Sequence, residues 1–158
     1  MSRLSILTKI FAISSAFVIF SVLQYSGSTQ TYVPVSQTVD RMQLKIGDGT
    51  VFVDIADTQS EHEKGLSGVR RLAEQAGVLF VFEYPDWRIF WNKDTFVPLD
   101  LVWIQHGVVV GLSSLPNVEI AGIVRTLSPE MSDQVLEVNR GWAKRNGVHV
   151  GSEVIGSQ

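Results

Sequence analysis

The chain has 158 residues, of which 13 are basic and 16 acidic, so its net charge is −3. This acidic balance argues against a nucleic-acid partner, because neutralising phosphates requires clustered lysines and arginines. The absence of cysteine excludes disulfides, cysteine nucleophiles and thiolate metal sites. At this length the sequence predicts one domain.

Residues 1–25 have the pattern of a signal peptide or a signal-anchor helix. Arg3 and Lys9 precede an uncharged, largely apolar run from Ile10 to Tyr25. A helix from Leu4 to Tyr25 would span roughly 33 Å, enough to cross a bilayer, with its basic flank left in the cytoplasm. No clear Ala-x-Ala cleavage site follows, although small residues do, so cleavage and retention as a membrane anchor both stay open.

The remaining chain is expected outside the cytoplasm. Residues 26–40, rich in Ser, Thr and Gln, predict a flexible linker. Residues 41–156 form the exported domain, which faces the periplasm or the outside from the inner membrane, or is secreted if the signal is cleaved. Without Arg3 and Lys9, 11 basic residues remain against 16 acidic ones.

The first part of this domain shows a hairpin, a short helix and a buried strand. Alternation over 42–46 and 51–56, around a Gly-Asp-Gly turn, predicts the hairpin. A helix should begin at Asp57–Thr58, where Thr58 and Glu61 fit a capping box, and stop at Gly65; Ser60 with Glu63 offers a competing frame. The apolar run over 77–82 predicts a strand, which residues 83–86 would break.

The second part predicts mainly short strands. They are expected over 88–91, 99–104, 108–112, 123–127 and 134–138, with a helical turn at 141–146 and a closing segment at 148–154. The fold class is therefore α+β: a compact, mainly antiparallel β-sheet or small barrel with two short helices, preceded by the N-terminal hydrophobic helix.

Familiar catalytic motifs do not emerge from the sequence. His62 and Glu63 begin like a zinc-protease helix, but that motif needs a second histidine where Leu66 stands. Ser67 and Ser128 lack the Gly-x-Ser-x-Gly context of an activated serine. Neither a metal site nor another cofactor is predicted.

The stretch from Phe90 to Asp100 combines an aromatic pair, a cation, two carboxylates and a hydroxyl. Along a strand, Trp91, Lys93 and Thr95 would share one face. These groups could serve the fold, or they could form a pocket with an aromatic wall and convergent polar groups. The candidate binding residues are Trp91, Lys93, Asp94, Thr95, Asp100, Glu137 and Arg70.

This stretch resembles the bacterial and archaeal family known as domain of unknown function 192. Gly77–Phe82 is similar to its Gly-Met-Leu-Phe-x-Phe strand, Phe90–Thr95 to its Phe-Trp-Met-Lys-Asn-Thr block, and Pro98–Asp100 follows at the expected distance. Blocks at 65–72 and 135–141 also match, so the resemblance covers roughly residues 42–154. It implies a compact, mainly β domain, often exported, without an established activity.

The chain also departs from the family pattern. Asn92 replaces the usual Met, Asp94 replaces the usual Asn, and Ser67 stands where Met is common. Residues 116–132 match poorly beyond Pro116. Asp94 adds a negative charge beside Lys93, which weakens any anion-binding role inferred from the family.

Three functions remain in competition. The preferred one is a non-catalytic binding or accessory domain of the cell envelope, tethered to the membrane by the N-terminal helix, in which Trp91 stacks on a small polar ligand such as a sugar. The second is a hydrolase of envelope or carbohydrate substrates with Asp100 and Glu137 as paired carboxylates, which need to lie roughly 5–9.5 Å apart for glycoside hydrolysis. The third is a structural or assembly factor with an envelope protein as partner.

Overall fold

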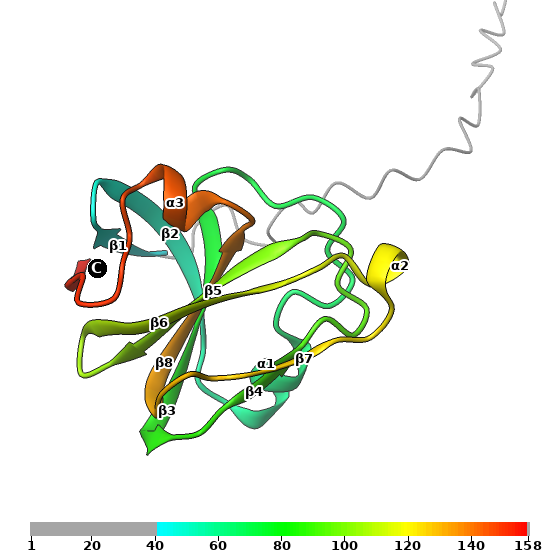
Figure 1. The fold of residues 1–158 in the computed structure, drawn as a ribbon, viewed down its shortest axis with the longest axis horizontal. Coiled ribbons are helices and arrows are strands. Elements are labelled where there is room, and N and C mark those ends of the chain that lie inside the picture. The colour runs from blue at the N-terminus through cyan, green and yellow to red at the C-terminus, as the bar shows by residue number, and fades with distance from the viewer. Residues whose placement is uncertain (1–40, 158) are drawn as a thin grey trace, which may run out of the picture.

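The computed structural model describes residues 41–157, which form a curled seven-stranded sheet and a separate two-stranded ribbon (Figure 1). The strand order in the sheet is β6-β5-β8-β3-β2-β1-β9, and the ribbon pairs β4 with β7. The elements in chain order are β1 (Met42–Ile46), β2 (Gly49–Ala56), α1 (Gln59–Lys64), β3 (Ala76–Asp86), β4 (Ile89–Trp91), β5 (Leu99–Gln105), β6 (Val108–Leu115), α2 (Val118–Ala121), β7 (Arg125–Leu127), β8 (Ser132–Asn139), α3 (Trp142–Arg145) and β9 (Val154–Ser157). The described residues are thus mainly β.

The sheet curls into a half-barrel, and its two edges meet at one end. Val108 at the start of β6 bridges Glu153 just before β9, and the Val154 amide donates to the Gly107 carbonyl at 2.8 Å. β2 and β3 pair in parallel, whereas the other neighbouring strands of the sheet pair antiparallel. A parallel pair needs a crossover connection, and residues 57–75, which include α1, provide it.

Each face of the sheet has its own hydrophobic core, because successive side chains of a strand point to opposite faces. The inner core lies inside the curl and is closed by α3; its buried members are Leu44, Ile46, Val51, Val53, Leu79, Val102, Ile104, Val109, Leu136, Val138, Trp142, Ala143 and Val148. The outer core lies on the other face, and Leu66, Val69 and Leu72 of the crossover pack against it. Its remaining members are Ala56, Ala76, Val78, Phe80, Val97, Leu99, Leu101, Trp103, Leu115 and Val135.

Most of the predicted elements are present. Both hairpins form, β1–β2 and β5–β6, with the expected turns. The capping box of α1 uses Thr58 and Glu61: the Glu61 amide donates to Thr58 Oγ1 at 3.4 Å, and the Thr58 amide donates to Glu61 Oε2 at 3.0 Å. The competing frame that begins at Ser60 is not used, and Gly65 ends the helix with a positive φ of 40°.

Two expectations about these elements were wrong. β3 does not end at residue 82 but continues through Pro85 to Asp86, where the ladder with β8 is interrupted, so the missing proline N–H is tolerated. The described residues contain three short helices rather than two, since α2 forms after Asn117. The expected closing segment over 148–154 is mostly loop, and the last strand, β9, begins at Val154.

The predicted N-terminal hydrophobic helix and linker lie outside the described residues. Among residues 41–157, none of the helices is long and apolar enough to cross a membrane.

Candidate functional site

The outer face of the sheet carries a pocket of about 400 Å³ between α1, β3, β4 and the turn after β4. We call it the aromatic pocket, since its wall consists of Phe80, Phe82, Trp87, Phe90 and Trp91. Four of the predicted site residues line it: Trp91, Lys93, Thr95 and Glu137. Sequence elements more than forty residues apart therefore meet at one site.

The aromatic wall is held against the sheet by edge-to-face contacts. The Phe80 and Phe90 ring centroids are 4.8 Å apart at 85°, and Phe90 meets the fully buried Trp103 at 5.5 Å and 90°. Such pairs add roughly 0.5–1.5 kcal/mol beyond burial. Phe82, two residues after Phe80, points to the same face and packs on His62 at 4.5 Å. Contacts with Trp103 and His62 thus hold the phenylalanine rings of the wall in place, whereas Trp91 at the mouth is 42% exposed.

Glu137 is the buried polar group of the pocket. It lies on β8 opposite Val78 and Leu101, two members of the outer core, and only 5% of its surface is exposed. Its carboxyl makes no hydrogen bond or ion pair with a described residue, and burial raises its pKa from 4.5 to about 8. Near neutral pH this carboxyl is therefore mostly protonated, and a protonated carboxyl can donate a hydrogen bond as well as accept one.

Gly65 leaves the space beside this carboxyl open. A Cβ at this position would lie 2.9 Å from Phe80 Cζ and 3.6 Å from Glu137 Oε2. The glycine that ends α1 thus also allows the chain to pass close to the pocket floor.

Cationic side chains line the pocket or lie beside it: Arg88 and Lys93 belong to its lining, and Arg125 contacts the Trp91 ring from outside that lining. Arg88 is held in place: its guanidinium donates to the Tyr84 carbonyl at 2.6 Å and the Ser132 carbonyl at 3.3 Å, and lies 3.9 Å above the Phe82 ring. Lys93 Nζ lies 5.4 Å from the centroid of the Trp91 ring, and the Arg125 guanidinium lies 5.2 Å from the same centroid. Both distances permit a cation–π attraction.

The turn after β4 brings Lys93 and Thr95 to the pocket. The expectation that they continue a strand from Trp91 was wrong, because β4 ends at Trp91. The turn is fixed by Asn92, a residue that sequence reasoning noted only as a departure from the family. Asn92 is fully buried. Its side-chain Nδ2 donates to the backbone carbonyls of Pro116 and Gly122 at 2.9 Å each, and its Oδ1 accepts from the backbone amide of Val124 at 2.7 Å.

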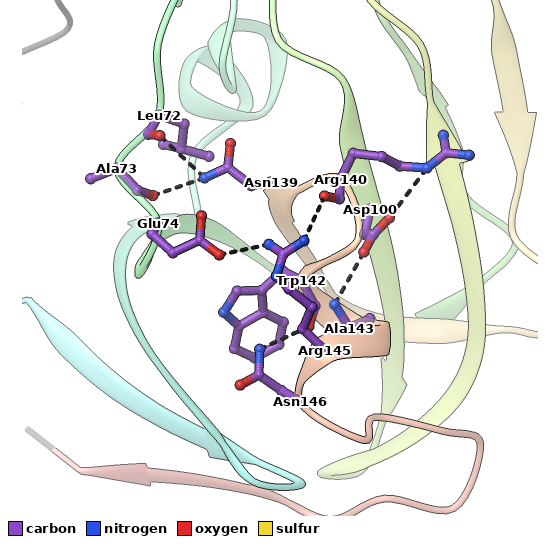
Figure 2. A network of polar contacts seen from close by, with 10 residues as sticks. All are labelled: Leu72, Ala73, Glu74, Asp100, Asn139, Arg140, Trp142, Ala143, Arg145 and Asn146. Atoms are coloured by element: carbon purple, nitrogen blue, oxygen red, sulfur yellow. Dashed lines mark hydrogen bonds and ion pairs between the residues drawn. The ribbon is translucent and has the colours of Figure 1, made fainter.

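Asp100 lies on the opposite face of the sheet from the pocket. On β5 it precedes Leu101, the residue directly opposite Glu137, so the two carboxylates point away from each other. Asp100 accepts a hydrogen bond from the Ala143 amide of α3 at 3.1 Å and lies 3.7 Å from Arg140 Nε (Figure 2). This placement contradicts the paired-carboxylate hydrolase, and it assigns Asp100 to the connection between β5 and α3.

Asp94 and Arg70 also lie outside the pocket lining. Asp94 is exposed in the turn with a φ of 54°, and its carbonyl accepts from the Gly68 amide at 2.8 Å. Arg70 pairs with Glu119 at 3.3 Å and lies 3.9 Å above the Phe96 ring. Both residues connect the crossover to the loops beside it.

Sequence reasoning missed several lining residues. Phe80 and Phe82 were recognised only as parts of a buried strand, and Trp87 and Arg88 only as neighbours of a short one. His62 lines the pocket, where its Nε2 contacts the carbonyls of Ala56 at 3.0 Å and Val81 at 3.1 Å. Within residues 41–157, no cluster of three or more His, Asp or Glu side chains could hold a metal ion.

Comparison with known proteins gives the family. The model of the domain of unknown function 192 family, described as an uncharacterized ACR, matches residues 42–156. The chain belongs to this family. No curated protein matches it.

Two crystal structures are similar to this family member. One, from Sinorhizobium meliloti 1021 and named a candidate transcription regulator, shares 31% identity, with a TM-score of 0.64 over 73% of this chain and 92% of that one. The other, a protein of unknown function from Novosphingobium aromaticivorans DSM 12444, shares 25% identity, with a TM-score of 0.66 over 77% of this chain and 89% of that one.

Proposed function

We propose that this domain binds a small polar ligand with a ring, such as a sugar, in the aromatic pocket, without catalysing a reaction. The observation that carries this proposal is Glu137, a residue that is only 5% exposed, lines the pocket and has no side-chain partner among the described residues. Its carboxyl oxygens are not among the fully enclosed polar atoms, so they face the space of the pocket. A ligand in the pocket can therefore form a hydrogen bond with Glu137.

The size and lining of the pocket support the same proposal. Small-molecule sites commonly measure roughly 300–1,000 Å³ and combine apolar walls with a few polar groups. The aromatic pocket, at about 400 Å³, falls within this range. Its flat rings suit the face of a sugar or another ring, while Thr95 and Glu137 provide polar contacts.

We place this binding function outside the cytoplasm on the pattern of residues 1–25, where a basic flank precedes an apolar run. Fractionation of cells that express the full chain tests the placement. The full chain should appear in the membrane fraction if the helix is retained, or outside the cytoplasm if it is cleaved. Recovery of the full chain in the cytoplasm would contradict this part of the proposal.

Binding is tested by titrating the full chain with neutral and acidic sugars and with cell-wall fragments, followed by tryptophan fluorescence and NMR. Trp87 and Trp91 at the pocket should report saturable binding. Trp91→Ala should weaken binding about tenfold, which corresponds to ~1.4 kcal/mol. Ile155→Ala serves as the matched control, since Ile155 is a large exposed side chain outside the pocket lining.

Two outcomes would count against the binding function. The first is no saturable binding of any ligand to the wild type. The second is equal affinity for the wild type and Trp91→Ala. Either result, together with a large loss of stability in pocket variants, would favour a role of these residues in the fold alone.

A further inference from the structure

The charges that line the aromatic pocket are unequal. Lys64, Arg88 and Lys93 line it, against the carboxyls of Glu63 and Glu137. No carboxylate of the described residues forms an ion pair with any of the three cations. Glu137 is mostly neutral near pH 7, because burial raises its pKa to about 8. The pocket is therefore positively charged.

This positive charge contrasts with the rest of the domain. Residues 41–157 contain 11 basic and 15 acidic side chains. Three of the basic ones nevertheless gather at one pocket, whose lining holds only one carboxyl besides that of Glu137, the carboxyl of Glu63. Asp94, the acidic neighbour of Lys93 in sequence, is exposed and does not line the pocket, so its carboxylate adds no further negative charge to the lining.

The three cationic side chains differ in how firmly their contacts hold them. Two backbone carbonyls and the Phe82 ring hold Arg88 in place. The two lysines are exposed and carry flexible four-carbon stems, so their ammonium groups can reorient toward a bound group. Arg88 thus contributes a fixed field, and the lysines can make direct contacts.

Building on the proposed function, we propose that the ligand is an acid. A carboxylate or phosphate on the ring-bearing molecule is held by Lys64 and Lys93 at the mouth, and the protonated Glu137 carboxyl donates a hydrogen bond to a ligand oxygen at the floor. The aromatic wall contacts the ring between these two ends. The pocket thereby selects an acidic ring compound over its neutral counterpart.

This arrangement makes binding depend on pH. From β3 and β5, the apolar residues Val78 and Leu101 face Glu137. The titratable and charged groups that share its pocket are His62, Glu63, Lys64, Arg88 and Lys93. When Glu137 ionises, it loses its donor proton and repels an anionic ligand. Affinity for the acid should therefore fall as the pH rises through about 8.

The test compares methyl glucoside, glucuronate and glucose 6-phosphate as probes of the full chain, by calorimetry at low salt. At least one acid should bind at pH 7 with tenfold or greater preference over the neutral glucoside, and added salt should reduce that preference. Glucuronate and glucose 6-phosphate separate a carboxylate site from a phosphate site. Lys93→Gln and Lys64→Gln should lower the acid-to-neutral affinity ratio, whereas Lys144→Gln, outside this pocket, should not.

The pH profile isolates Glu137. If only the protonated form binds, the affinity of the wild type for the acid should fall about tenfold between pH 7 and pH 9. In Glu137→Gln, which cannot ionise at this position, the ratio of the two affinities should stay close to one. Circular dichroism confirms that each variant is folded, and the two lysine variants keep the test valid if Glu137→Gln is not.

The possible failures are distinguishable. Equal or tighter binding of methyl glucoside would overturn the acid specificity and leave the binding function standing. An identical pH dependence in the wild type and Glu137→Gln would overturn the role of Glu137 as donor. No saturable binding of any of the three probes would overturn the acid specificity, whereas the binding function falls only if the wider titration with sugars and cell-wall fragments also gives no saturable binding.

Discussion

Replacing Glu137 with Gln should change how the stability of the domain depends on pH. The folded-state pKa of Glu137 is about 8, against an ordinary value of 4.5, because the carboxyl is desolvated. Between these values the folded domain keeps a proton that the unfolded chain has released. The stability that this bound proton gives the folded domain is fully present below about pH 4.5 and is lost as the pH rises through about 8.

The magnitude follows from the linkage relation. Each pH unit in this window lowers the free energy of unfolding by about 1.4 kcal/mol. The loss reaches about 3 kcal/mol at pH 7 and levels off at about 5 kcal/mol above pH 8, a large share of the 5–15 kcal/mol typical of a domain. Gln at position 137 has a similar shape and no ionisation, so it removes this slope.

Urea denaturation of both proteins across roughly pH 5 to 9 measures the effect. Other titrating groups are common to both proteins and largely cancel in the difference between their unfolding free energies. The free energy of unfolding of Glu137→Gln should rise relative to that of the wild type by about 1.4 kcal/mol per pH unit, up to about pH 8. A difference that stays constant across the series would refute the claim that Glu137 is buried and unpaired.

Other variants test the neighbouring assignments. Asp100→Ala should lower the free energy of unfolding by about 1–3 kcal/mol, since the first turn of α3 loses its acceptor, yet it should leave ligand affinity unchanged; reduced affinity would place Asp100 in the site after all. Asn92→Ala should lower stability by about 2–4 kcal/mol and speed hydrogen exchange in residues 122–124, and unchanged exchange would contradict its role as an anchor. Gly68→Ala should cost about 1–2 kcal/mol because this glycine has a positive φ, and Gly65→Ala should cost more, because its φ is also positive and its Cβ would lie close to Phe80. Only Gly65→Ala should also weaken binding, since its methyl group would meet Phe80, whereas the space at Gly68 is open; equal binding by the two variants would argue against a ligand at the pocket floor.

The predictable part of the fold depends on local patterns. The hairpins follow from alternation with Gly-rich turns, and the start of α1 follows from the Thr58–Glu61 pair. α2 was missed because four residues are too few for a helical period; the Asn117 side chain caps it and also donates to the Phe96 carbonyl, a tertiary contact. The length of β3 was missed because Pro85 normally ends a strand, and only the interrupted ladder with β8 permits it here.

The predictable part of the site is limited by strand register. Trp91, Lys93 and Thr95 come together because they are close in sequence. The position of Asp100 could not be inferred, because a shift of one residue between β5 and β8 would move it to the other face. The positions of Phe80 in the pocket wall and of His62 beside it could not be inferred either, because they depend on how the crossover packs against the sheet.

The pairing of the first and last strands has a consequence for when the domain can form. Residues 43–46 of β1 pair with residues 154–157 of β9, close to the C-terminus in Figure 1. While the chain is being synthesised, β1 therefore lacks its outer neighbour until residues 154–157 have emerged. A variant without residues 154–157 would leave that edge exposed, and an exposed edge strand is a template for pairing with another molecule. β9 thus protects the domain from self-association through the edge of β1.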